Sequence, residues 1–124
     1  MNSSPLIMKK NTLLSPTQSG VCSLLAPVEN VAHGIVSRAV LTTPELRLTL
    51  FHFAAGQELS EHTSTARALV QVLSGTCEFT VGPTVHTLKP GDLLHLPPGA
   101  PHALTTAEPF SMLLTQVTEP PTPK

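Results

Sequence analysis

Hydrophobic and polar positions in this chain alternate in short runs that are separated by turn residues. Eight runs rich in β-branched, aromatic and aliphatic residues follow one another: Ile35–Leu41, Leu46–Phe53, Ala68–Leu73, Cys77–Val81, Val85–Leu88, Leu93–Leu96, His102–Thr105 and Phe110–Val117. Pro or Gly occurs in almost every separator, where it interrupts regular structure. Short runs of this kind at this spacing predict strands of an all-β sandwich or barrel.

Two patterns within the runs indicate which faces are buried. Leu46, Leu48 and Leu50 alternate with polar residues, which predicts one dry face for that strand. The pairs Leu69–Val70 and Leu93–Leu94 are apolar on both faces, which suggests strands covered on both sides. No helix is expected to cover an outer face, so we predict a partner subunit instead.

The predicted partner is a second copy of this chain. Outward apolar positions such as Leu69 and Leu73 would form the interface of a homodimer. We divide the chain into an N-terminal arm with short edge strands at 1–30, a β-barrel domain at 31–118 and a disordered Pro-rich tail at 119–124. The arm can lie on the partner.

The charge composition of the chain excludes some classes of binding partner. The 124 residues include 7 basic and 8 acidic side chains, a formal net charge of −1. This balance argues against nucleic acid or an anionic membrane surface, because clustered Lys and Arg bind both. No apolar run reaches the roughly 18 residues that span a bilayer, so we expect a cytoplasmic protein. Cys22 and Cys77 are too far apart for a zinc knuckle or redox pair and are interpreted as small buried residues.

Candidate chemistry lies with the six histidines. A single strand histidine is usually a surface residue or a hydrogen-bonded core residue, but two of them follow turn signals at suggestive spacings. Gly56 is followed after five residues by His62, and an extended segment places His62 and Ser64 on the same side. Gly91 leads through a Pro-x-Gly turn to His102 at the start of the next run.

These two segments resemble the two sequence motifs of the cupin barrel. The second motif is matched at Gly91, Pro97, Gly99 and His102, with Thr106 where Asn is usual, and the first at Gly56, His62 and Gly75. The resemblance covers about residues 46–117. It implies a double-stranded β-helix, the small antiparallel jelly-roll barrel of that family, which is commonly dimeric.

The resemblance also implies where a metal would lie. In typical metal-binding cupins the ligands are two His and one Glu of the first motif and one His of the second. Carried over by position, they fall on His62, Ser64, Ala68 and His102. Only two donors remain, so a divalent ion (Fe, Mn, Ni or Zn, which the sequence does not distinguish) would bind weakly. In the alternative, His62 and His102 are hydrogen-bonded to each other, to Ser64 or to water.

Other residues can complete or accompany such a site. His52 and His95 lie on neighbouring strands, and either would restore a site of three or four histidines if it faced the barrel interior. Glu61 points the other way in a regular strand. Arg67 can hold a substrate carboxylate at the barrel mouth or remain solvated.

Three functions stay open from the sequence. The first is a metal-dependent enzyme that acts on a small, mostly apolar molecule, the second is a small-ligand-binding module without turnover, and the third is a closed, filled barrel. No Tyr is present to serve as a catalytic acid. Residues predicted to line the pocket are Ser64, Ala68, Val70, Val72, Leu104 and Met112, with Leu93 as a further apolar position.

Overall fold

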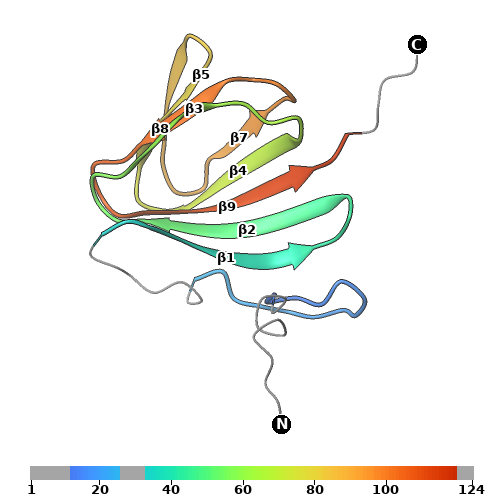
Figure 1. The fold of residues 1–124 in the computed structure, drawn as a ribbon. Coiled ribbons are helices and arrows are strands. Elements are labelled where there is room, and N and C mark those ends of the chain that lie inside the picture. Colours follow the sequence, from blue (N-terminus) through green and yellow to red (C-terminus); the bar gives the residue numbers. More distant parts are fainter. Residues whose placement is uncertain (1–11, 26–32, 120–124) are drawn as a thin grey trace, which may run out of the picture.

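The fold of this chain consists of strands. The computed structural model describes residues 12–25 and 33–119, and within them nine strands and no helix are found (Figure 1). The strands are β1 (Ile35–Thr42), β2 (Leu46–Phe53), β3 (Glu58–His62), β4 (Arg67–Ser74), β5 (Cys77–Val81), β6 (Thr84–Leu88), β7 (Leu93–Leu96), β8 (His102–Thr105) and β9 (Phe110–Val117). No helix able to cross a membrane occurs in this part of the chain.

The strands form two antiparallel sheets that face each other as a flattened barrel (Figure 1). One sheet has the order β1-β2-β9-β4-β7 and the other β3-β8-β5-β6. The predicted fold class, an all-β jelly-roll barrel, is therefore confirmed, and all eight predicted runs are strands. The sequence pattern missed β3, because four of its five residues are exposed and no hydrophobic alternation marks it.

The core fills the space between the two sheets. It combines inward residues of both: Phe53, Val70 and Phe110 of the five-stranded sheet and Phe79 and Leu104 of the four-stranded sheet are almost fully buried. β9 pairs with both β2 and β4 along its whole length, so its inward side chains lie at the centre of the larger sheet. Close packing of these side chains is what holds the two sheets together.

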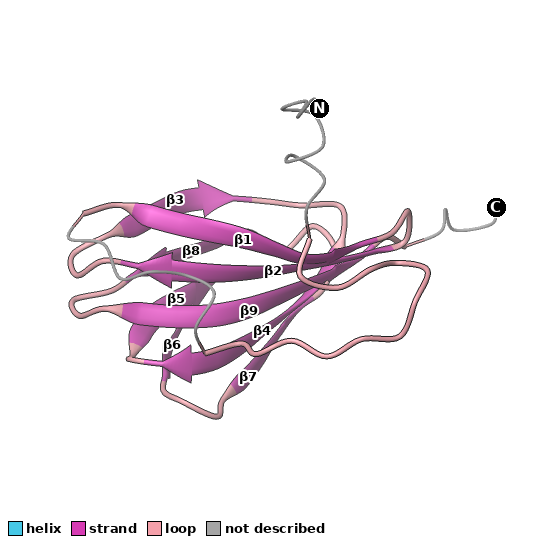
Figure 2. Ribbon diagram, turned by 90° about the horizontal axis from the view of Figure 1, so that it is seen from below, coloured by secondary structure: helices cyan, strands magenta, loops and turns pink. Residues whose placement is uncertain are grey.

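The outer face of the five-stranded sheet is covered by the N-terminal arm. Figure 2 shows residues 12–25 crossing this face. The Leu14 amide donates to the Val40 carbonyl at 2.8 Å, and apolar residues of the arm pack on a second cluster that includes Leu50 and Leu113. Residues 12–25 form no strand, so the edge strands predicted there are absent. The rest of the predicted arm before residue 31 and the predicted tail after Glu119 lie outside the described residues.

The sequence predicts strands that are covered on both faces, and the structure shows such cover at only some of the outward apolar positions. Leu73 faces outward and packs against the cluster under the arm, so part of the cover comes from the same chain. Leu93 faces outward and is 64 % exposed. The homodimer therefore stays a prediction.

One turn requires glycine for two reasons. Gly75, between β4 and β5, has a φ of +75°, which residues with a Cβ rarely adopt. A Cβ at this position would also overlap the Pro109 carbonyl oxygen, which is backbone and cannot move aside easily. The loop before β9 can therefore approach the β4–β5 turn closely only because residue 75 is Gly.

Candidate functional site

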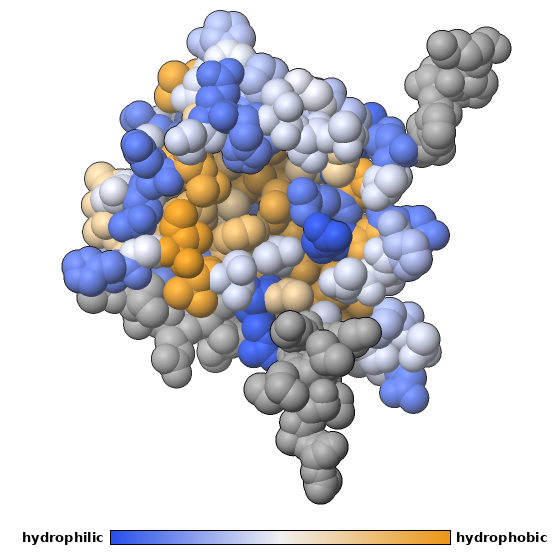
Figure 3. Space-filling view, in the orientation of Figure 1, coloured by the Kyte–Doolittle hydropathy of each residue, from blue (hydrophilic) through white to orange (hydrophobic). Residues whose placement is uncertain are grey.

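An open cavity lies between the two sheets. Its volume is about 160 Å³, and Figure 3 shows the corresponding face hollowed at its centre, with hydrophobic residues on the floor and hydrophilic residues around it. An apolar cavity of roughly 150 Å³ can hold a molecule of benzene's size. The cavity lining is Phe51, Leu59, His62, Ser64, Ala66, Ala68, Val70, Phe79, Leu96, Pro97, Ala100, His102, Ala103, Leu104, Met112, Leu114 and Gln116.

Two histidines from distant parts of the sequence meet in this cavity. His62 at the end of β3 and His102 at the start of β8 are register partners across the two strands. Their ring centroids are 4.2 Å apart and the rings meet edge to face. The sequence motifs therefore indicated correctly that these two side chains lie together.

Hydrogen bonds fix which ring nitrogen of each histidine carries the proton. His62 Nδ1 lies 2.9 Å from the Ser60 carbonyl oxygen, and His102 Nδ1 lies 2.9 Å from the Ala100 carbonyl oxygen. A carbonyl oxygen can only accept, so Nδ1 must donate in both rings. In the neutral form each Nε2 then keeps its lone pair.

The chain is shaped locally to present these rings. In β3 the pairing with β8 shifts between Leu59 and His62, and this bulge lets both residues line the cavity although strict alternation would put them on opposite faces. Before β8, the Ala100 amide donates to the Pro97 carbonyl and closes a turn. The Gly99 amide donates to the Ser64 carbonyl at 2.8 Å and ties this turn to the β3–β4 loop.

The cavity lining around the histidine pair is mostly apolar. Phe79 lies nearly parallel to the His102 ring, with centroids 6.0 Å apart. None of the described lining residues carries a formal charge, and the polar ones are His62, Ser64, His102 and Gln116. His62 is exposed and His102 is partly buried, so the pair lies where this mostly apolar lining meets solvent.

The structure brings together five of the six residues predicted to line the pocket. Ser64, Ala68, Val70, Leu104 and Met112 line the cavity. Val72 is buried in the core but does not line it. Leu93, the further apolar position, lies on the outside of the barrel, because its neighbour Leu94 takes the inward position on β7.

His52 does not reach the cavity. Its neighbours Phe51 and Phe53 on β2 face the core, so His52 shares the outer face with Leu50, beneath the arm. There its Nδ1 lies 2.9 Å from the Ser111 hydroxyl oxygen. The expectation that His52 completes a metal site is therefore wrong. His52 lies on the same face of β2 as the leucines of that strand, and this face points away from the barrel interior.

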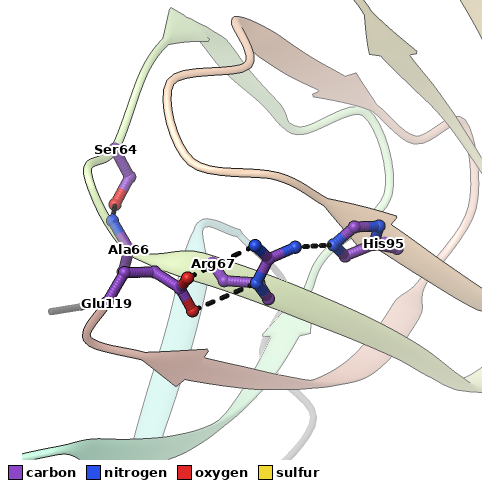
Figure 4. A network of polar contacts seen from close by, with 5 residues as sticks. All are labelled: Ser64, Ala66, Arg67, His95 and Glu119. Carbon is purple, nitrogen blue, oxygen red and sulfur yellow. Dashed lines mark hydrogen bonds and ion pairs between the residues drawn. The ribbon is translucent and has the colours of Figure 1, made fainter. Parts of the chain in front are cut away.

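His95 and Arg67 are also on the outer face, where Figure 4 shows them joined. The Arg67 guanidinium lies 2.8 Å from His95 Nε2 and bonds the Glu119 carboxylate through Nε and Nη2. This contact lowers the pKa of Glu119 and raises that of Arg67, through the hydrogen bond first. Arg67 is therefore not placed to hold a substrate at the mouth of the barrel, and His95 does not line the cavity.

Sequence reasoning missed Gln116. It lines the cavity beside Ala68, its register partner on β4. The signal was present, because Met112, Leu114 and Gln116 share one face of β9 by simple alternation, and Met112 was already assigned to the pocket. Thr106, which stands where the family has Asn, is buried away from the cavity and donates to the Thr76 and Glu108 carbonyls.

The donor set does not fit the metal centre that the resemblance implies. Two imidazoles are present, but Ala68 and Ser64 stand where the family places a carboxylate and a further histidine. Among the described residues no group of three or more His, Cys, Asp or Glu side chains could hold an ion. An ion bound here would lack the negative ligand that offsets its charge.

Comparisons with known proteins agree with this fold. Residues 49–116 match the family model described as cupin domain. A protein of unknown function from Streptococcus pyogenes is 30 % identical, with 90 % of this chain and 97 % of that chain covered and a TM-score of 0.77. A cupin superfamily protein from Desulfitobacterium hafniense is 25 % identical, with 88 % and 100 % covered and a TM-score of 0.77.

A third solved structure has the higher identity over a shorter region. A cupin 2 conserved barrel domain protein from Leptotrichia buccalis is 35 % identical, with 73 % of this chain and 44 % of that chain covered and a TM-score of 0.70. Among curated proteins no significant match is found. The similarity therefore establishes the type of barrel and leaves its chemistry to the residues of the cavity.

Proposed function

Since this chain belongs to the cupin family, we propose that it binds a small, mostly apolar organic molecule in its barrel through His62 and His102. The observation that carries this proposal is the pair of Nδ1 contacts to backbone carbonyls. These contacts leave two Nε2 lone pairs in a cavity lined mostly by apolar side chains. A ligand with one hydroxyl or N–H group and an apolar body matches both features.

The same geometry supplies a candidate proton acceptor. A neutral imidazole can act as a general base when its free nitrogen lies within hydrogen-bond reach of the proton. His62 and His102 each have their ring orientation fixed by one hydrogen bond, as a positioned base requires. Ligand binding needs only the hydrogen bond, whereas turnover would need transfer of the proton.

A metal-dependent enzyme is the second candidate, and the free Nε2 atoms of His62 and His102 favour it. Imidazole nitrogen is a good ligand for Fe, Ni and Zn. The missing carboxylate at Ala68 counts against tight binding of such an ion. The metal content of the purified protein decides between the two candidates.

The test compares phenol with toluene, which have similar size but differ in the hydroxyl group. We expect isothermal titration calorimetry to give about tenfold tighter binding for phenol, the ratio for one hydrogen bond. The double variant His62→Leu/His102→Leu should remove this difference, whereas His33→Leu, at an exposed position before β1, should preserve it. Equal affinities for the two probes, or no binding of either, would contradict the proposal.

The metal content of the same proteins separates the two candidates. The protein is loaded with Fe²⁺, Mn²⁺, Ni²⁺ or Zn²⁺, desalted and analysed by mass spectrometry. Substoichiometric metal that is equal in wild type, His62→Ala and His33→Ala supports the ligand-binding protein. Stoichiometric metal that is lost only in His62→Ala and His102→Ala supports the metal-dependent enzyme.

We also propose that the protein is a homodimer. The outward side chain of Leu93 supports an interface on the outer face of the larger sheet, where it is 64 % exposed. Light scattering of the purified protein should give twice the mass of one chain, and Leu93→Asp should shift it toward a single chain. A monomeric wild-type protein would contradict this proposal.

A further inference from the structure

We propose that the ligand of this barrel is a small monocarboxylic acid with an apolar body, and that Arg47 binds its carboxylate. This inference rests on the proposed function, because it extends the same cavity. It concerns a residue outside the cavity lining and a second, smaller pocket that adjoins it.

The second pocket is polar and shares a wall with the cavity. It has a volume of about 110 Å³. Its lining residues are Thr43, Pro44, Leu46, Arg47, Ala66, Gln116 and Thr118. Ala66 and Gln116 belong to both linings, so the two spaces abut where these residues lie.

Strand register places Arg47 next to the cavity wall. Arg47 on β2 is the partner of Gln116 on β9, and Gln116 is in turn the partner of Ala68 on β4. These three positions form one row across the larger sheet, and cross-strand partners point to the same face. Because Gln116 and Ala68 line the cavity, Arg47 continues the same inward row at its open end.

Within the described part of the chain, the positive charge of Arg47 is not balanced by a nearby acidic side chain. It forms no ion pair among the residues that the structure describes, whereas Arg67 is paired with Glu119. Its two cross-strand partners, Thr42 and Gln116, are neutral. Glu45 is close in sequence, but it is exposed and does not line the pocket.

One ligand molecule could occupy both pockets. The apolar body would occupy the uncharged cavity, and the acidic group would extend past Ala66 and Gln116 to the guanidinium. Guanidinium and carboxylate match in geometry and form two parallel hydrogen bonds. The Gln116 amide, which lines both spaces, can donate a further hydrogen bond to the same carboxylate.

The experiment uses two probes that differ only in this charge. They are 4-hydroxyphenylacetate and the neutral 4-hydroxyphenylacetamide, and both keep the phenol group that the histidines would accept. We expect calorimetry of the full chain to show about tenfold tighter binding of the carboxylate, as for a charge-assisted hydrogen bond. Raising the salt from about 0.05 to about 0.5 M should reduce that preference.

Variants assign the preference to a residue. Arg47→Gln should remove it by weakening binding of the carboxylate far more than binding of the amide. Gln116→Leu, as an independent variant, should weaken carboxylate binding in part. The matched control is Arg38→Gln, because Arg38 on β1 pairs with the outward Leu50 and should have no effect.

The possible failures are distinguishable from those of the proposed function. Equal affinities of wild type for the two probes, or a preference that survives Arg47→Gln, would overturn the role of Arg47 and leave phenol binding intact. Binding of phenol without binding of either probe would also overturn it, because the cavity then ends at Gln116. Loss of phenol binding itself would overturn the proposed function.

Discussion

His62 and His102 are direct partners across β3 and β8, and their imidazole rings meet edge to face with centroids 4.2 Å apart. Each ring donates from Nδ1 to a carbonyl two residues earlier in its own strand or turn. The two rings therefore leave the same kind of atom, Nε2, free of these backbone contacts, and both residues line the cavity. This arrangement supports the proposed role of the pair in ligand binding.

The first prediction concerns the tautomers of these two rings. Long-range ¹⁵N–¹H correlation spectra above pH 7.5 should show His62 and His102 with the proton on Nδ1, because a carbonyl oxygen holds it there. The exposed His33 serves as an internal reference. Protons on Nε2 in either ring would contradict the geometry on which ligand binding depends.

The second prediction restores the missing acidic ligand. Ala68→Glu places a carboxylate on the cavity wall, where it supplies a third ligand and a negative charge beside the two imidazoles. The affinity for Ni²⁺ or Zn²⁺ should rise by at least about tenfold, since charge compensation governs binding at such sites. The measurement is a competition titration with a chromophoric chelator.

A matched variant controls for the mere addition of a buried charge. Val70→Glu lies two residues further along β4 and also faces the cavity. It should destabilise the fold, because a buried carboxylate without a partner is costly, and it should give a smaller gain in metal affinity. Equal gains from both variants would show that position 68 has no special relation to the histidines.

The architecture followed from the sequence because turns and alternation are local signals. The run Leu46–Phe53 is a strand with the boundaries that its pattern predicts. Alternation does not, however, say which of two faces is inside. Leu50 and Phe53 are both buried, one under the arm and the other in the barrel core. Alternation therefore leaves open whether His52 faces the cavity, and the structure places it on the face that the arm covers.

Site residues that belong to a short local motif could be predicted from the sequence. Site residues whose position depends on how the strands pair could not. His102 follows a Pro-Gly turn that fixes its position, so its place in the cavity could be inferred from sequence. The pairing shift in β3 and the row from Arg47 through Gln116 to Ala68 depend on the register of three strands. No short stretch of sequence encodes that register, and Arg67 was considered for the role that we assign to Arg47.

The third prediction tests the β4–β5 turn. Gly75→Ala should lower the free energy of unfolding by about 3 kcal/mol or more, since it adds an overlap with the Pro109 carbonyl to the cost of a positive φ. Gly56 has a similar positive φ, but a Cβ added there would meet open space. Gly56→Ala should therefore lower the free energy of unfolding by only about 1 kcal/mol. Urea denaturation measures both. Equal losses would mean that the contact with Pro109 is not tight.

The fourth prediction concerns the two thiols. Burial, with a smaller contribution from the negative charge of Glu78, raises the pKa of the Cys77 thiol to about 12. Cys77 is 3 % exposed, whereas Cys22 belongs to the N-terminal arm and is only partly buried. Iodoacetamide at pH 8 should therefore modify Cys22 in the folded protein, and Cys77 only after unfolding. Rapid modification of Cys77 in the native state would contradict its place in the core.

The raised pKa of Cys77 also implies a loss of stability at high pH. In the unfolded chain the thiol loses its proton near pH 8.5, whereas in the folded chain it keeps the proton until about pH 12. Between these values the unfolded state binds fewer protons, so the free energy of unfolding falls as the pH rises. The wild type should lose more stability than Cys77→Ala between pH 8 and pH 10.5, as urea denaturation at each pH would show. Parallel curves for the two proteins would mean that the thiol ionises equally easily in both states, which its burial among Phe79, Leu88 and their neighbours does not allow.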